Sequence, residues 1–472
     1  MKKTILLAAA LASPFIVNAQ NSAEGTRIRE LEQKLESLEQ KYRILERKLE
    51  IGDEAASEKS KTAPAVTIGA SGFTMRSADT NFVVKIRGLL QMDSRWYIND
   101  PDIRANDTFL LRRARPVIEG TVFRDFDFLF VPEFGGTGAP SILDAYINYK
   151  YSPALQLRLG KFKEPVGLEQ LQSDSQAPFI ERGLPSLLTP NRDLGIQLHG
   201  ELWETLLTYQ VGVFNGIGDN RNTTNADTDD EKDVAARVFF HPFVRSENEY
   251  LKGLGVGIAG SYGNHEGESG LPAGNGYVTS GQQSFFQYAP AAIAGVSPTV
   301  TADGDAWRWT PQAYWYYGPF SLLGEYVVSS QWLRLSAPAP GAPIINEFEH
   351  TSWQVVAGYV LTGEDATYRG VTPRKTFNLS EGSWGAFEVV ARYGELDIDD
   401  DVFASGGPTQ FANPARWATE IASYGLGLNW YLNRNIRSAV NYYHTDFKGG
   451  NAPGALPSEN EDAIFTRVQL SF

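Results

Sequence analysis

The sequence predicts an all-β membrane protein, a sixteen-stranded antiparallel transmembrane β-barrel preceded by a short N-terminal α-helical coiled coil. Three observations predict this class. The chain begins like an exported protein, apolar and polar residues alternate with period two from about residue 81 onward, and the last strand ends on an aromatic residue, Phe472. Taken alone, the last strand would also fit the edge of a soluble β-domain, and the N-terminus decides between the two.

Residues 1–19 have the form of a cleavable signal peptide. Two lysines precede an apolar run over residues 5–17, and a small-residue cleavage site ends at Ala19. A transmembrane anchor would need about 20 apolar residues, and this run is shorter and contains Pro14. No later stretch is apolar enough to span as a helix, so insertion into a membrane would require a closed barrel. The absence of cysteine excludes a disulfide framework and thiol chemistry.

Residues 20–50 predict a coiled-coil helix. Apolar residues recur at alternating spacings of three and four, which is a heptad seam, at Ile28, Leu31, Leu35, Leu38, Tyr42, Leu45 and Leu49. A coiled coil with so few heptads is only marginally stable in isolation, and we therefore interpret the helix as a segment that holds several copies of the protein together. The alternative is a lone helix packed against its own barrel. Residues 51–80 are predicted to be a linker, flexible over 51–64, with a short strand or plug segment over 66–75.

Residues 81–472 predict the barrel domain. Strands are expected near 82–97, 107–123, 125–134, 141–151, 154–162, 192–202, 205–215, 233–243, 251–262, 304–317, 319–335, 346–360, 384–397, 421–432, 435–446 and 462–472. Each strand with its connection then takes roughly 24 residues, as expected for a barrel with short periplasmic turns and long outer loops. An even number of strands closes an antiparallel barrel, and sixteen enclose an aqueous channel.

One face of these strands is unusually apolar. Trp307, Trp309, Trp315 and Tyr317 share one face of a single strand. A soluble sandwich or propeller would also have repeated strands, but this surface would cause aggregation in water. We therefore expect the apolar face to contact lipid and the polar face to line the lumen.

The charges that alternation places inward are mostly basic. The basic set is Lys85, Arg87, Arg95, Arg113, Arg115, Lys150, Arg158, Arg237, Arg308, Arg392, Arg437 and Arg467, and the smaller acidic set is Asp93, Glu119, Asp127, Glu133, Asp144, Glu325 and Glu388. Guanidinium groups favour anions through forked hydrogen bonds. We expect an anion-preferring lumen; the alternative is that the arginines only pair with inward acids and stiffen the wall.

Two segments depart from regular alternation. Arg112 and Arg113 cannot both face inward on a regular strand, and an arginine facing lipid at the midplane costs roughly 2–4 kcal/mol. Either a bulge turns both inward or Arg112 extends to the membrane interface. Residues 160–191 lose alternation altogether. A stretch this long without strands inside a barrel is typical of a functional loop, and we expect it to fold inward as a constriction.

The sequence predicts no enzyme, no cofactor and no metal site. It contains no His-Glu-x-x-His or Gly-x-Ser-x-Gly pattern, and no Ser/His/acid arrangement stands out for an outer-membrane hydrolase. The acidic residues 227–233 lack the glycine and spacing of a calcium-binding hand, which leaves loose cation binding as the alternative there.

Several motifs resemble the phosphate- and polyphosphate-selective porin family, whose members are trimeric sixteen-stranded barrels. They are FLLRRAR at 109–115, Glu119 with Gly120, RDFDF at 124–128, DAY at 144–146, GKFKEPVGLE at 160–169, ARY at 391–393 and Leu396 with Asp397. The resemblance covers roughly residues 82–472. It implies a passive channel with an anion site at its waist, formed by basic wall residues and polar residues of the inward loop.

Carried over by motif, the resemblance implies that Arg112, Arg113 and Arg115 are the donors on the wall and that Asp144 tempers anion retention. The inward loop would add Lys161, Lys163, Ser173 and Ser175, and the alternation adds Arg87, Arg158 and Arg392 as pore-lining candidates. The chain departs from the arginine-stacked funnel of phosphate-specific members, because Lys252 is the only lysine or arginine between Arg245 and Arg308. A general anion preference is what the residues themselves support.

The predicted function is therefore an outer-membrane porin that passes small anions, with phosphate or polyphosphate as candidates, down their gradient. The alternatives are a general-diffusion porin and a structural protein that tethers the envelope through its N-terminal helix. The expected partners are small anions, outer-membrane lipid, two further copies in a homotrimer and the cell wall near a periplasmic helix; no nucleic acid is expected.

Overall fold

The computed structural model describes residues 21–98, 106–226, 230–268, 270–272, 276–288, 290, 298–336, 342–403, 410–450 and 460–472. The predicted signal peptide, residues 1–19, lies outside them, as do residues 227–229 of the acidic loop. Within the described part of the chain, no helix is both long enough and apolar enough to cross a membrane. Contacts divide the chain after Pro64 into two compact units, which are described separately.

The first unit contains helix α1 (Asn21–Thr62). Its start agrees with the prediction, but it continues through residues 51–62, so the prediction of a flexible linker there is wrong. The physical reason is intrinsic propensity: after Gly52 this segment is mainly Ala, Glu, Lys and Ser, with no proline before Pro64, and it stays helical without an apolar stripe.

The second unit begins with a hairpin. Strands β1 (Ala65–Gly69) and β2 (Gly72–Arg76) pair with each other, and β2 also pairs with the first residues of β3, where Phe73 lies opposite Ile86. In place of the short strand or plug segment predicted over 66–75 within the linker, the structure has two paired strands attached to the barrel wall.

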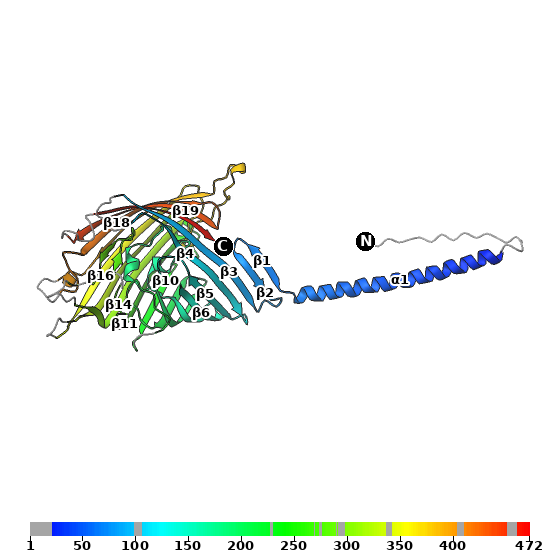
Figure 1. Ribbon diagram of the computed structural model, residues 1–472, viewed down its shortest axis with the longest axis horizontal. Coiled ribbons are helices and arrows are strands. Elements are labelled where there is room, and N and C mark those ends of the chain that lie inside the picture. The colour runs from blue at the N-terminus through cyan, green and yellow to red at the C-terminus, as the bar shows by residue number, and fades with distance from the viewer. Residues whose placement is uncertain are drawn as a thin grey trace. The chain divides into compact units, whose positions relative to one another are not determined.

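Sixteen strands close the barrel, as predicted. The sheet has 18 strands, of which β1 and β2 lie outside the ring. The ring consists of β3 (Val83–Tyr97), β4 (Thr108–Val122), β5 (Phe126–Glu133), β6 (Ser141–Ser152), β7 (Leu155–Lys163), β8 (Arg192–Leu202), β9 (Leu207–Phe214), β10 (Asp233–Phe240), β11 (Leu254–Gly267), β14 (Val300–Tyr317), β15 (Phe320–Leu335), β16 (Ile344–Val360), β17 (Ala386–Asp397), β18 (Ala418–Tyr431), β19 (Ile436–Gly449) and β20 (Asn460–Ser471). Each pairs antiparallel with its neighbour, and Figure 1 shows the tilted strands around the lumen.

Strands β20 and β3 close the ring, from Ala463 opposite Tyr97 to Ser471 opposite Leu89. The terminal residue continues the pairing: the Phe472 amide donates to the Gly88 carbonyl at 3.0 Å, and the Gly88 amide donates back at 2.9 Å. A Cβ added at Gly88 would lie 2.8 Å from the Phe472 ring. Glycine at this position therefore allows the aromatic C-terminus to lie against the first strand.

The two faces of the wall differ as predicted. Outward residues such as Leu426, Val468 and Trp309 are large, apolar and exposed, at 61%, 58% and 42% of their surface. Inward residues such as Asn429 and Arg467 are polar and buried. A polar residue on the inside can be buried only if something fills the lumen beside it, and several connections do so.

The first is the segment 164–191 between β7 and β8, with helix α2 (Leu168–Leu171) and the 3₁₀ helix η1 (Leu184–Leu188). We call it the constriction loop. The second is the segment 276–288 between β11 and β14, with β12 (Tyr277–Val278) and β13 (Ser284–Phe286), which we call the inserted hairpin. The third, between β16 and β17, carries Tyr368 and η2 (Leu379–Glu381).

The inserted hairpin departs from the expectation that the long connections are outer loops, because it folds into the lumen. The Tyr97 hydroxyl on β3 donates to the Gly281 carbonyl at 2.8 Å, Arg392 on β17 donates to the Ser280 hydroxyl at 2.8 Å, and Thr279 donates to the Glu461 carboxylate on β20 at 2.8 Å. Its aromatic residues join a buried apolar cluster with the wall residues Val327, Leu333 and Phe348 and with Leu184 and Leu188 of the constriction loop. Alternation could not predict this, because the apolar residues of the hairpin are mostly adjacent pairs, Tyr277 with Val278 and Phe285 with Phe286, rather than alternate positions. The remaining short helices, α3 (Glu249–Lys252) and η3 (Asp400–Phe403), lie in other connections.

Candidate functional site

The constriction loop crosses the lumen and is bonded to distant parts of the wall. Gln91 on β3 donates to the Asp174 carbonyl at 3.0 Å, the Glu325 carboxylate on β15 accepts the Leu168 amide at 2.8 Å, and Asn441 on β19 accepts the Ile180 amide at 2.7 Å. Strands β19 and β3 flank β20, whereas β15 lies four strands from β19 and the loop itself starts at the end of β7. A loop bonded to β3, β15 and β19 must therefore extend across the bore. The predicted inward constriction is confirmed.

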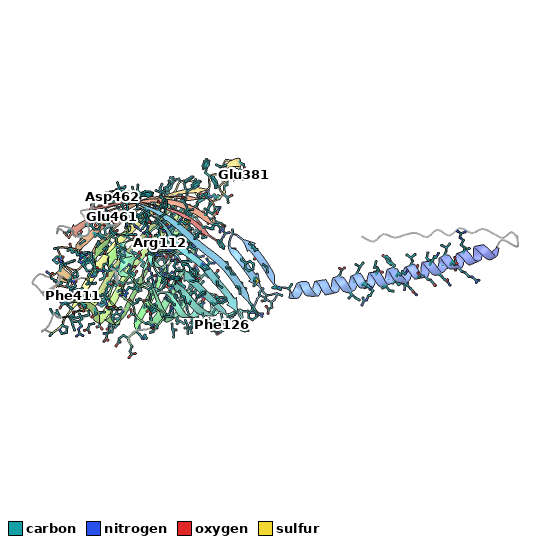
Figure 2. The ribbon with its side chains drawn as sticks, in the orientation of Figure 1. Arg112, Phe126, Glu381, Phe411, Glu461 and Asp462 are labelled. Atoms are coloured by element: carbon teal, nitrogen blue, oxygen red, sulfur yellow. The ribbon has the colours of Figure 1, made fainter. Side chains whose placement is uncertain are left out.

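A β-bulge in β4 resolves the position of the neighbouring arginines. Gln91 pairs with Arg113 and Met92 pairs with Leu111, so Arg112 is an extra residue without a partner in the ladder. Arg112 and Arg113 then both reach the lumen, where Arg112 Nε donates to Glu181 at 2.9 Å and Arg113 Nη1 donates to Gln91 at 2.8 Å. Figure 2 places Arg112 between the labelled residues Phe411 and Phe126 of the two barrel ends.

A cavity of about 320 Å³ lies where the bulge faces the constriction loop. Its lining comes from the wall, the constriction loop, the segment after β9 and the inserted hairpin: Arg112, Arg113, Arg115, Glu133, Gly135, Leu143, Gln170, Asp174, Glu181, Arg182, Gly183, Ser186, Leu187, Asn191, Arg192, Asn220, Asn222, Val278, Thr279 and Gln282. Five arginines therefore face three carboxylates, an excess of two positive charges among the lining residues. The remaining polar residues are amides and hydroxyls that can donate hydrogen bonds.

The cavity's carboxylates are shared between arginines. Asp174 lies 3.3 Å from Arg113 and 2.6 Å from Arg182, and Arg115 also pairs with it. Burial alone would raise the pKa of Asp174, but the three guanidinium groups around it hold the pKa well below its usual value. Burial opposes ionisation of Glu181 too, and nearby arginines, Arg112 first, lower its pKa. Both loop carboxylates are therefore charged.

The structure brings together the three predicted wall donors, Arg112, Arg113 and Arg115, and places Asp144 one contact away. Asp144 accepts from Arg192 at 3.2 Å, and Arg192 lines the cavity. This pairing holds one of the five cavity arginines in place.

The other predicted loop residues bond elsewhere. Lys161 Nζ donates to the Thr223 carbonyl at 2.7 Å, and Lys163 Nζ donates to the Gln170 and Gln172 carbonyls at 2.6 and 2.9 Å. Both ammonium groups thus hold backbone in place.

The serines and the remaining arginines predicted for the pore also lie outside the cavity lining. The hydroxyls of Ser173 and Ser175 lie 3.0 Å from each other. Arg87 pairs with Glu119, the Arg158 guanidinium lies 4.4 Å from the centre of the Tyr146 ring, and Arg392 donates to the Glu181 carbonyl at 3.0 Å. None of these five residues is among those that line the cavity described above.

Sequence reasoning missed Asp174, Glu181, Arg182 and Arg192, which complete the charge pattern, and the hairpin residue Thr279. One signal was available: the adjacent charges Glu181 and Arg182 follow an apolar pair inside a loop expected to be buried. Charged residues are rarely buried without partners, so their presence in the loop points to a charged neighbour on the wall.

The arrangement suits the binding of a small anion. Guanidinium groups present rigid pairs of donors that match the oxygens of phosphate or carboxylate. Within the described residues there is no group of three or more His, Cys, Asp or Glu side chains able to hold a metal ion.

Comparisons with known proteins concern the family and the fold of this chain. A family model described as "Phosphate-selective porin O and P" matches residues 84–472. Porin O of Pseudomonas aeruginosa is 23% identical over 437 residues, covering 85% of this chain and 91% of that protein. Among solved structures, the outer membrane channel DcaP of Acinetobacter baumannii shares the fold with a TM-score of 0.52 and 13% identity, covering 85% of this chain and all (100%) of that one. The trimer form of OmpT of Vibrio cholerae has a TM-score of 0.50 and 10% identity, covering 83% and 99%.

Proposed function

This chain belongs to the phosphate-selective porin O and P family, and from that premise we propose that the arginine-lined cavity is the waist at which small anions bind as they cross the barrel. The protein is an outer-membrane β-barrel porin that conducts anions. We assign the selection of these anions to the residues that line the cavity.

The observation that carries the proposal is the excess of two positive charges around one cavity. Low-dielectric walls focus the field of such a cluster and raise the local concentration of anions while repelling cations. Neutral donors such as Asn191, Asn220 and Gln282 surround the charges, so an anion that enters can replace part of its hydration shell. Passage requires binding that favours entry but is weak enough to allow exit.

Phosphate or polyphosphate is the anion class we assign to this waist. A tetrahedral oxyanion offers separate oxygens to several guanidinium forks at once, whereas a chloride ion offers a single acceptor atom. The inserted hairpin contributes Thr279 and Gln282 to the lining in place of arginines, so the approach from that side is neutral. We therefore propose a preference among anions set at the waist rather than by a charged funnel.

The test is to remove the excess charge. Replacing Arg112 and Arg115 together with glutamine leaves three arginines facing three carboxylates in the cavity. The reversal potential of the double variant in a planar bilayer under a potassium chloride gradient should move from anion-preferring toward zero, because the net attraction for anions is gone. Glutamine keeps a neutral hydrogen-bond donor at the distance of the arginine Nε, which limits the loss of packing.

Arg245→Gln is the matched control. Arg245 is 57% exposed at its side chain on a turn and pairs with Glu204 at 3.2 Å, outside the cavity. Its reversal potential should equal that of the wild type. An unchanged reversal potential in the Arg112/Arg115 double variant would refute the assignment of the waist.

The proposal includes a homotrimer held in part by α1. The seam residues of this helix are unpartnered in the single chain, with Leu31, Leu38 and Leu45 exposed at 60%, 67% and 59%. Heptad seams bury such residues between copies. At 1.5 Å per residue, the 42-residue helix is about 63 Å long, enough for it also to reach toward the cell wall and act as the envelope tether.

Deleting residues 21–60 tests both roles of α1. We expect the channel conductance to persist, because the barrel closes without the helix, while the fraction of trimer in detergent falls as measured by chemical cross-linking. Loss of co-sedimentation with purified cell-wall material would support the tether. A stable trimer with unchanged co-sedimentation would refute both roles.

A further inference from the structure

Of the described residues, Asp174 and Glu181 are the only carboxylates that the constriction loop contributes to the cavity lining. Six guanidinium groups converge on them. Asp174 is approached by Arg113, Arg115 and Arg182, and Glu181 by Arg95, Arg112 and Arg467 at 2.9, 2.9 and 3.7 Å. Four of these arginines, Arg112, Arg113, Arg115 and Arg182, line the cavity, so the two carboxylates occupy donors that a permeating anion would also use.

The loop has other anchors besides these carboxylates. Around Asp174 the backbone is held by wall side chains: Gln91 donates to the Asp174 carbonyl at 3.0 Å, Gln469 to the Ser175 carbonyl at 3.0 Å, and Arg437 to the Ala177 carbonyl at 2.8 Å.

The backbone around Glu181 is anchored in the same way. Arg467 donates to the Ile180 carbonyl at 2.8 Å, Arg392 donates to the Glu181 carbonyl at 3.0 Å, and the Glu181 amide donates to the Tyr443 hydroxyl at 3.1 Å. A carboxylate whose backbone is fixed from elsewhere can release its arginine without releasing the loop.

The pairs at the cavity are also more open to water than a purely structural pair in the same barrel. Arg467 and Asp93 are sealed, with side chains 1% and 0% exposed. Arg112, which pairs with Glu181, is 28% exposed, and Arg182, which pairs with Asp174, is 18% exposed. An anion in the cavity can therefore reach the outer donors of these two arginines.

We infer that Asp174 and Glu181 are tethered counter-ions that compete with the permeating anion for the guanidinium groups of Arg112, Arg115 and Arg182. This inference rests on the proposed function and adds the groups that limit how tightly the cavity holds an anion. A tethered carboxylate competes for the guanidinium donors at a high effective concentration. The net affinity for an anion is therefore the difference between its own binding and that of the side chain it displaces. The site therefore releases anions readily. It favours phosphate over chloride, because phosphate carries more charge and has several acceptor oxygens.

Asp174→Asn tests the inference, because asparagine has nearly the same shape without the charge. Chloride conductance is measured in planar bilayers while inorganic phosphate is titrated in as a blocker. The half-blocking concentration of phosphate should fall about ten-fold, the change expected when one charge-assisted competitor is lost, with the chloride conductance of an open channel little changed. Asp174→Glu should block like the wild type, because it keeps the competing charge.

A purely structural role of Asp174 predicts the opposite result: a loosened loop would raise the chloride conductance and weaken the block. Glu181→Gln repeats the test at the second carboxylate, so the inference does not depend on one variant folding well. Asp127→Asn is the matched control; Asp127 pairs with Lys150 at 2.7 Å on the wall, away from the cavity, with both side chains about a third exposed (35% and 34%).

The outcomes separate the two proposals. If phosphate does not block the wild type at all, the proposed function fails. If phosphate blocks the wild type but neither Asp174→Asn nor Glu181→Gln tightens the block, the inference fails and the proposed function stands. The inference also fails, and the proposed function stands, if Asp127→Asn tightens the phosphate block as much as Asp174→Asn does. The block would then depend on the total charge of the barrel rather than on the carboxylates of the cavity.

Discussion

Replacing Asp93 with alanine is expected to lower the free energy of unfolding of the barrel by about 3–5 kcal/mol, the cost of removing the carboxylate that a buried arginine bonds through two donors. Arg467 donates to Asp93 through both Nε and Nη2, at 2.6 and 2.7 Å, and neither side chain is more than 1% exposed. The pair joins β3 to β20, where the ring closes. Urea unfolding in lipid vesicles, followed by tryptophan fluorescence, would measure the loss.

Two comparisons make this result specific. Asp127→Ala breaks an ion pair of the same charge type that is about one third exposed, and should cost only about 0–1 kcal/mol. The double variant Asp93→Leu with Arg467→Met removes both charges and should recover much of the stability lost in Asp93→Ala, because the buried arginine that lost its carboxylate is then removed as well. Equal losses for Asp93→Ala and Asp127→Ala would contradict the argument.

Deleting the inserted hairpin, residues 276–288, is expected to raise single-channel conductance several-fold. The hairpin places Tyr277, Phe285 and Phe286, each no more than 1% exposed, inside the ring, and the ring itself is of the size that encloses an aqueous channel. Its removal also takes Thr279 and Gln282 from the cavity lining. Planar-bilayer recordings in potassium chloride would measure the change.

The control for this deletion removes residues 137–139, an exposed part of the connection between β5 and β6. Its conductance should match that of the wild type. The anion preference of the hairpin deletion should persist in weaker form, because the arginines of β4 and of the constriction loop remain. A hairpin deletion with wild-type conductance would mean that the apolar cluster does not limit the flow of ions.

Much of the fold could be read from the sequence because its signals are local. Alternation identified every strand of the ring, and the heptad spacing identified α1. The prediction of a linker was wrong over residues 51–62 because a segment without an apolar stripe can still be helical through propensity alone. At the site, the arginine triplet of β4 was recognised from its density in one strand.

The partners of those arginines could not be read in the same way. Arg112 pairs with Glu181, which is 69 residues away in the sequence, and Arg467 pairs with Asp93, which is 374 residues away. Lys161, Lys163 and Arg392 share the charge of the cavity arginines, but they hold loop backbone instead. Which of these roles a basic residue takes depends on where the loops lie.

The sequence by itself therefore determined the barrel, its strand number, its apolar exterior and its basic interior, since each follows from the period-two pattern along single strands. The tertiary structure alone decided that a bulge turns Arg112 inward, that the constriction loop brings Asp174 and Glu181 to the arginines, and that a hairpin enters the lumen. The physical reason is that these features depend on contacts between residues far apart in the chain, and no local periodicity encodes the path of a loop through a closed ring.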